Sequence, residues 1–212
     1  IDRHRVPGMF LLLGSASPLL MRSTADSLAG RIGFLTLHPL HLSELGLEQG
    51  NVMRHWWRGG FPDALKGDFL EWWEQYLRML LERDLPQYGI AADPLFLRRL
   101  LTMLAHQQGG LFNASALGAS LGVSYHTVQR YVDVLQSVFL VRRLPPFFRN
   151  VGKHLANAPK VYLRDTGLLH HLLNIGSHEM LAAHPARGAS WEGFVIEDIL
   201  RRERLAHPAS QP

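Results

Sequence analysis

The sequence predicts a mainly α-helical protein with small β elements, and three observations lead to this fold class. Apolar residues recur at helical spacing in residues 69–81. Residues 94–136 divide into segments that start at helix-capping residues and end at glycines or at a turn. Two short runs, 138–144 and Lys160–Leu163, then favour β-strands that form a hairpin.

The composition is that of a folded globular protein. The chain has 212 residues, of which 47% are hydrophobic and 19% are charged, so it can bury a core. It contains no cysteine, which excludes disulfides and thiolate metal sites and favours a reducing cytoplasm. No run of about 18 apolar residues is present, so we expect no membrane span. The formal net charge of +4 indicates only tolerance of polyanions.

The first third of the chain predicts two short strands. The run from Phe10 to Leu13 is continuously apolar and stops at Gly14-Ser15, which is typical of a strand buried on both faces of a parallel sheet. A second strand is expected at residues 32–37. Because neighbouring strands are not evident in the sequence that follows, we expect the rest of this sheet to lie upstream of Ile1.

The next segment predicts one long amphipathic helix over residues 69–81. Its apolar stripe is broad and rich in aromatic residues, which indicates core packing rather than a ligand platform. The opposite face carries charged residues, with Glu74 and Arg78 at a spacing that allows a pair. Pro86 is expected to end the helix, because proline has no backbone N–H to donate.

Residues 94–167 predict a winged helix-turn-helix. The expected order is a helix from Pro94 to His106, a helix capped by Asn113, a helix capped by Ser124 that runs to about Gln136, and two strands at 138–144 and Lys160–Leu163. A tight turn at Gly122-Val123 separates the second helix from the third. In the third helix, Val128, Tyr131, Val132 and Leu135 are expected to face the core.

This module holds the candidate DNA-binding residues. The outward side of the third helix carries Tyr125, His126, Gln129 and Arg130, where a recognition helix meets the major groove, and Gln and Arg suit contacts to adenine and guanine. The hairpin that follows has no acidic residue from its first cation to its last. Its cations are Arg142, Arg143, Arg149, Lys153, Lys160 and Arg164. A basic wing beside a recognition helix is typical of contact with double-stranded DNA. The alternative is a solvated hairpin or a module that packs against another domain.

The last segment predicts two more helices. Asp165 is expected to cap a short helix at 168–173, and Ser190 to cap a final one. One face of the final helix carries Trp191, Phe194, Val195 and Ile199 and would need a partner beyond the residues that remain. The twelve histidines are scattered, so we expect no metal site.

The sequence contains no motif for nucleotide hydrolysis or covalent catalysis. A Gly-x-x-x-x-Gly-Lys-Ser/Thr loop, a Gly-x-Ser-x-Gly elbow and a His-Glu-x-x-His pair are all absent. We therefore expect no catalytic residues and no ATP hydrolysis by this chain alone.

Six separated motifs nevertheless resemble one family in the same order. They are Gly14-Ser15, Ser27-Leu28-Ala29-Gly30-Arg31, Arg58-Gly59-Gly60-Phe61-Pro62, Arg83-Asp84-Leu85-Pro86, the run from Lys160 to Leu168, and the run from Gly188 to Val195. The chain resembles prokaryotic AAA-type ATPases, related to archaeal ATPases, whose C-terminal half is a domain of unknown function. The resemblance covers nearly the whole chain.

The resemblance implies four segments. Residues 1–45 would be the C-terminal end of an AAA-type ATPase core, 46–93 a helical lid or linker, 94–167 the winged helix-turn-helix, and 168–212 the beginning of a restriction-endonuclease-like region. Ser15 and Arg31 would sense nucleotide. ATP and Mg²⁺ would be cofactors of the full-length protein, held by a missing N-terminal ATPase core and not by this chain.

Three functions follow from these expectations. The first is an ATP-driven switch whose winged helix binds DNA. In the second, the winged helix is a protein–protein packing module without DNA. In the third, the chain is part of a nuclease-like protein, whose metal-binding strands would lie beyond Pro212. Apolar surface at both ends would also favour a homo-oligomer.

Overall fold

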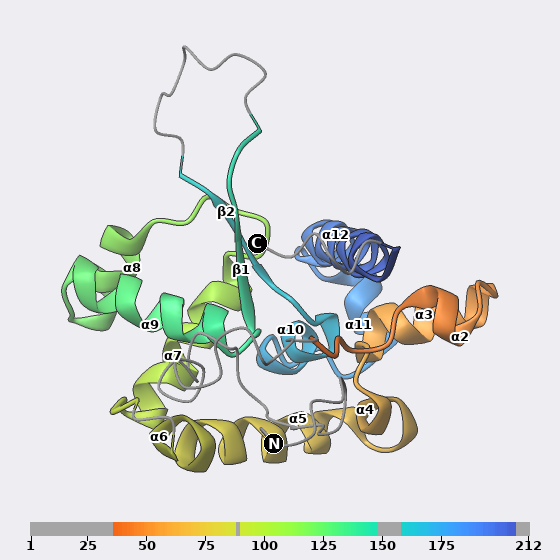
Figure 1. The fold of residues 1–212 in the computed structure, drawn as a ribbon, viewed down its shortest axis with the longest axis horizontal. Coiled ribbons are helices and arrows are strands. Elements are labelled where there is room, and N and C mark those ends of the chain that lie inside the picture. Colours follow the sequence, from red (N-terminus) through yellow and green to blue (C-terminus); the bar gives the residue numbers. More distant parts are fainter. Residues whose placement is uncertain (1–35, 88–89, 148–157, 207–212) are drawn as a thin grey trace, which may run out of the picture.

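The computed structural model describes residues 36–87, 90–147 and 158–206. Within these ranges the chain is mainly helical, with one two-stranded antiparallel sheet (Figure 1), so the predicted fold class is confirmed. The strand expected at Phe10–Leu13 lies outside the described residues. Of the strand expected at 32–37, only Thr36 and Leu37 are described, and neither belongs to a strand.

The described residues form helices along most of their length, with two strands between the helices Tyr125–Ser137 and Thr166–Leu172. Their order is α2 (Leu42–Leu45), α3 (Gln49–Arg58), α4 (Pro62–Lys66), α5 (Phe69–Met79), η2 (Leu80–Asp84), α6 (Leu85–Gln87), α7 (Pro94–His106), α8 (Ala114–Leu121), α9 (Tyr125–Ser137), β1 (Val141–Leu144), β2 (Lys160–Leu163), α10 (Thr166–Leu172), α11 (His178–Ala183) and α12 (Arg187–Ala206).

The long helix α5 does not end at Pro86 as predicted. It begins at Phe69 and is capped by Asp68, whose carboxylate accepts hydrogen bonds from the backbone N–H groups of Leu70 and Glu71. It then widens into the π-helical turn η2 and continues through Pro86 in α6. In a regular α-helix, proline removes one backbone bond and its ring meets the carbonyl four residues earlier. The π turn just before it shifts the bonding, and Leu85 N–H donates to Leu80 O five residues back.

The predicted three-helix module is confirmed with its caps. Asn113 accepts from the Ala116 N–H at the start of α8, and Ser124 accepts from the Thr127 N–H at the start of α9. The turn between these helices depends on two glycines. Gly122 has φ 71°, in the left-handed region, and a Cβ on Gly118 would lie 2.7 Å from Val123 O.

The hairpin pairs as predicted, but its first strand is shorter than expected. Val141 faces Leu163 and Leu144 faces Lys160 in an antiparallel register. Residues 138–140 belong instead to the exit from α9, where Phe139 has a φ of 63° and Leu140 N–H donates to Leu135 O. A run of apolar residues after a helix therefore does not by itself extend the strand.

The C-terminal helices differ from the prediction at one cap. Asp165 caps α10 as expected, accepting from the N–H groups of Gly167 and Leu168. Ser190, by contrast, lies inside α12, which already begins at Arg187. Its backbone N–H donates to Ala186 O, and its hydroxyl is turned into the core. The prediction that Ser190 caps the last helix is wrong, because this serine serves a buried contact.

One hydrophobic core joins these elements around α10. Leu168 and Leu169 of α10 are fully buried, and this helix packs on α3, α5, α7 and α12 (Figure 1). The apolar face of α12 finds part of its partner there, since Phe194 is buried and packs edge-on against His55. Trp191 and Ile199 on the same helix remain 38% and 53% exposed.

Two glycine-containing loops interlock at the centre of this core. The Gly60 N–H donates to Asp165 Oδ2 at 2.9 Å, while Asp165 Oδ1 accepts from Gly167 N–H at 2.8 Å. A Cβ on Gly167 would lie 2.0 Å from Arg58 O, and one on Gly59 would lie 1.9 Å from Asp165 Oδ1. Glycine is needed at 167 because the backbone of Arg58 lies against it, and at 59 because φ is 83° and the Asp165 carboxylate lies against it.

Replacing Gly167 by alanine should therefore destabilise the protein by at least about 2 kcal/mol, because the added methyl cannot be accommodated without moving backbone. Gly188→Ala is the matched control, since nothing lies within 4 Å of its Cβ position in α12, and alanine there should be neutral or stabilising by about 0.5 kcal/mol. Urea unfolding of both variants measures the difference. Equal stability of the two variants would contradict the interlock.

Candidate functional site

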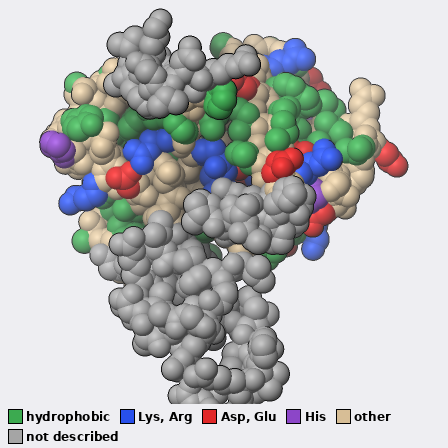
Figure 2. Space-filling model, turned by 45° about the horizontal axis from the view of Figure 1, so that its top comes forward, with side chains coloured by type: hydrophobic (Ala, Val, Ile, Leu, Met, Phe, Trp, Pro, Cys, Tyr) green, Lys and Arg blue, Asp and Glu red, His purple; other side chains and the backbone are tan. Residues whose placement is uncertain are grey.

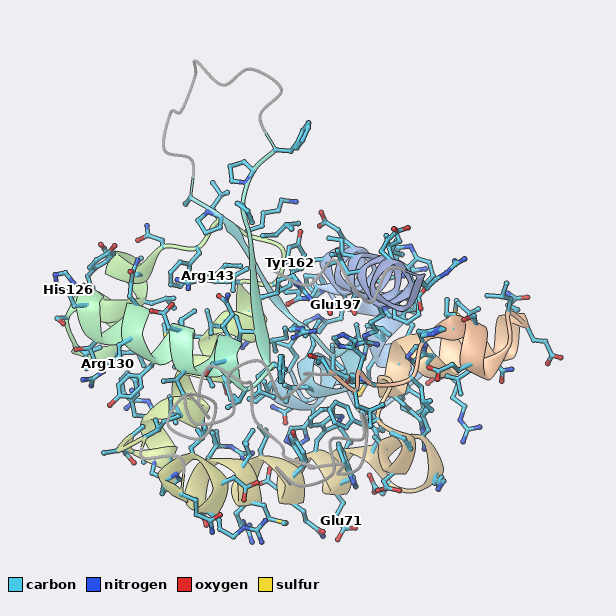
Figure 3. All side chains as sticks on the ribbon, in the orientation of Figure 1. Glu71, His126, Arg130, Arg143, Tyr162 and Glu197 are labelled. Atoms are coloured by element: carbon cyan, nitrogen blue, oxygen red, sulfur yellow. The ribbon has the colours of Figure 1, made fainter. Side chains whose placement is uncertain are left out.

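The outward side of α9 carries the predicted DNA-contacting residues at the surface. Tyr125 is 43% exposed, His126 and Arg130 are exposed, and Gln129 is half-buried. His126 and Arg130 lie on the outer side of α9, away from the body of the molecule (Figure 3). The described contacts of Arg130 are with Tyr131, whose ring centre is 5.0 Å from the guanidinium carbon.

The cations of the hairpin are placed differently from the prediction. Arg143 in β1 donates to Asp133 and Gln136 of α9. Lys160 in β2 donates from Nζ to Glu192 Oε1 of α12 at 2.8 Å. Both pairs are partly exposed, so each contributes at most about 1 kcal/mol.

A buried carboxylate holds the two remaining hairpin cations that the structure describes. Glu197 of α12 is 2% exposed and accepts from Arg142 of β1 and from Arg164 just after β2, the latter at 3.2 Å. Burial acts to raise the pKa of Glu197, but the hydrogen bond from Arg142 and the positive charge of Arg164 outweigh it and lower this pKa. Glu197 is therefore held ionised between two guanidinium groups.

The hairpin is therefore not a free basic wing. Its own sequence contains no acid, yet α9 and α12 bring carboxylates to Arg142, Arg143, Lys160 and Arg164. On the face shown in Figure 2, blue Lys and Arg side chains lie next to red Asp and Glu side chains and do not form one continuous blue area. Figure 3 shows Arg143 and Glu197 lying inward, between the helices and the hairpin.

Four predicted site residues lie outside the described residues, so the structure places none of them: Ser15, Arg31, Arg149 and Lys153. Sequence reasoning missed Glu192 and Glu197 as partners of the hairpin. The available signal was that both are acidic residues on the helix that follows the acid-free hairpin.

A small polar recess lies beside the Glu197 cluster. Its volume is about 180 Å³, including space open to solvent, and it is lined by His55, Gly60, Arg164, Asp165, Thr166, Phe194, Glu197 and Arg201. Opposite charges line it in equal number, so it favours neither an anion nor a cation. Burial raises the pKa of Asp165, against the charge of Arg201 and the three backbone N–H groups that bond this carboxylate.

A serine–histidine contact in the core is structural. His170 Nε2 lies 2.8 Å from Ser190 Oγ, and His170 Nδ1 lies 2.8 Å from Trp57 O. Ser190 also accepts from Trp56 Nε1 at 3.0 Å. Both Ser190 and His170 have no exposed surface, so a substrate has no access to this hydroxyl. Burial lowers the pKa of His170 to about 4, so the imidazole is neutral at pH 7.

The described residues also show no metal cluster and no spanning helix. Within 36–87, 90–147 and 158–206, no three or more histidine, aspartate or glutamate side chains gather as metal ligands. Nor is any helix in these ranges both long and apolar enough to cross a bilayer.

Comparison with known proteins identifies the family. The family model for the domain of unknown function DUF8612 matches residues 49–179, which is more than half of the chain and runs from α3 into α11. The chain belongs to the DUF8612 family. No solved structure matches the chain at a significant level.

Three relatives of this DUF8612 protein carry the name uncharacterized protein. Those of Mycobacterium tuberculosis and Mycobacterium bovis are each 43% identical over 203 residues, covering 94% of this chain and 46% of the relative. One from Haemophilus influenzae is 24% identical over 220 residues, covering 91% of this chain and 51% of the relative. The chain thus spans about half the length of these relatives.

Two of the buried histidines, His55 and His170, predict a pH dependence. Burial lowers the pKa of both His55 and His170 from 6.5 to about 4. The stability that comes from keeping them neutral is complete above pH 6.5 and declines as the pH falls toward 4, because the unfolded chain binds protons first. Each histidine should contribute up to about 3 kcal/mol over that interval. Urea unfolding between pH 6.5 and 5 measures this, and a flat profile there would contradict it.

The two carboxylates of α12 should differ in their effect on stability. Glu197→Gln leaves the guanidinium groups of Arg142 and Arg164, whose side chains are only 16% and 10% exposed, without a counter-charge and should cost about 3 kcal/mol. Glu192→Gln is the matched control, since Glu192 is 43% exposed in its side chain, and should cost less than about 1 kcal/mol. Thermal and urea unfolding compare the variants. A cost for Glu197→Gln as small as the control's would show that the triad is dispensable.

Proposed function

We propose that this chain is a non-hydrolytic part of an AAA-type ATP-dependent protein, in which the helix–hairpin module of residues 94–167 is a packing module. One observation carries the packing role: all four hairpin cations within the described residues bind carboxylates of α9 or α12. A module whose cations are neutralised within the chain presents little charge to phosphates. Its work is then to join parts of the protein.

The ATP-dependent part of the proposal is supported by resemblance and by length. The motifs around Ser15 and Arg31 resemble the end of an AAA-type core, and the relatives have about as much chain again beyond the matched region. Residues that would hold ATP and Mg²⁺ would lie in that additional chain. The described residues supply no metal cluster for them, so no chemical step is assigned to this chain.

A second candidate function, DNA binding through α9, is favoured by the exposure of Tyr125, His126 and Arg130. The Arg143–Asp133 and Lys160–Glu192 pairs are partly exposed, and a phosphate could replace their carboxylates at little cost. This function therefore does not require the buried Glu197 triad to open.

Duplex binding at low salt separates the two candidates. For a packing module, fluorescence anisotropy with a labelled duplex at about 50 mM salt should show no binding at micromolar concentrations of the chain, and Glu192→Gln should change nothing. Salt-dependent binding that is lost in Arg130→Glu, but kept in the exposed control Arg187→Glu, would overturn the packing role in favour of DNA. Absence of ATP hydrolysis from the whole protein would contradict the ATP-dependent part.

A further inference from the structure

The segment at residues 38–42, here called the strap, is bound to the body at three places. It is the red-orange segment with which the described chain begins (Figure 1). The Leu40 N–H donates to Gly60 O at 2.8 Å, and the Leu42 N–H donates to Asp198 Oδ1 of α12 at 2.9 Å. Leu40 O in turn accepts from Arg201 of α12 at 3.2 Å. The strap is thus held mainly by α12.

Arg201 connects the strap directly to the end of the hairpin. Its side chain is buried, with 5% of the residue exposed. One terminal nitrogen donates to Leu40 O, and the other donates to Arg164 O at 3.1 Å, just after β2. The planar guanidinium group suits this task, because its donors have a fixed geometry and can bridge two carbonyl oxygens at once.

The same turn of α12 also fixes the hairpin through side chains. Glu197 binds Arg142 and Arg164, while Asp198, the next residue, binds the strap. Carboxylate and guanidinium groups at this depth are costly to leave without partners. A shift of α12 that breaks its contacts with the strap would therefore also disturb the contacts of Glu197 with the hairpin, and the reverse holds as well.

We propose that α12 couples the strap to the β1–β2 hairpin through Arg201, so that displacing residues 38–42 loosens the hairpin. Coupling of this kind is reciprocal, so loosening the hairpin also loosens the strap. The inference goes beyond the packing role, because it assigns to α12 a coupling between two named segments. It involves neither nucleotide nor DNA and can fail independently of the proposed function.

Hydrogen–deuterium exchange on the isolated chain tests the coupling from both ends. Asp198→Ala removes the acceptor of the Leu42 N–H, and it should speed exchange of hairpin amides such as Arg164 N–H, which donates to Leu140 O, by about tenfold. Asp68→Ala is the matched control, since it also removes an aspartate that accepts from backbone N–H groups, at the start of α5. This control should leave the hairpin amides at the wild-type rate.

The reciprocal variant is Arg142→Met, which changes β1 and should speed exchange of the Leu42 amide although Arg142 binds Glu197 and not the strap. In an Arg201→Lys background, the faster hairpin exchange of Asp198→Ala and the faster Leu42 exchange of Arg142→Met should both become smaller. An ammonium group cannot reproduce the bridge from Arg201 to Leu40 O and Arg164 O. Hairpin amides that stay unchanged in Asp198→Ala, or that change equally in Asp68→Ala, overturn the proposal. Should Asp198→Ala fail to fold, the exchange rate of the Leu42 amide in Arg142→Met is the deciding measurement, and a wild-type rate there overturns the proposal.

Discussion

The ion triad of Glu197 with Arg142 and Arg164 is the interaction on which the arrangement of the C-terminal half depends. A buried carboxylate and two guanidinium groups with side chains only 16% and 10% exposed lie between α12 and the hairpin, and each charge would be unfavourable alone. The ion pairs among these groups hold α12 in place, because a small displacement would leave a guanidinium or a carboxylate group without a partner. The position of α12 in turn determines which carboxylates meet the hairpin and which residues bind the strap.

Much of the local structure was predictable, because capping is a short-range property. Asn113, Ser124 and Asp165 each accept backbone bonds within three residues of their own position, and each was recognisable from its place before an apolar stretch. Ser190 looks like a cap in the sequence, because a serine before an apolar helical stretch gives the same pattern whether its hydroxyl binds the helix backbone or a distant side chain. Here it binds Trp56 and His170, which are distant in the sequence.

The charge of the candidate site could not be predicted, because it depends on tertiary contacts. Between Arg142 and Arg164 the chain has no acid, and the inference of a basic wing treated this segment by itself. The neutralising carboxylates come from α9 and from α12, up to 55 residues away. Likewise, the sequence around Gly59 and Gly167 gives no reason for glycine, because the atoms that a Cβ would meet belong to residues distant in the sequence: Asp165 for Gly59 and Arg58 for Gly167.

The burial of the triad also determines how the hairpin responds to solution conditions. The screening length of dissolved ions is about 10 Å at 0.1 M salt and shortens as salt is added, and buried pairs are screened much less than exposed ones. Raising the ionic strength therefore releases Lys160 from Glu192 long before it affects Glu197. The cost of dehydrating charged groups falls as temperature rises, so warming favours the triad relative to the surrounding apolar packing. The hairpin is thus held by a salt-sensitive contact, between Lys160 and Glu192, and by a heat-tolerant contact, the Glu197 triad.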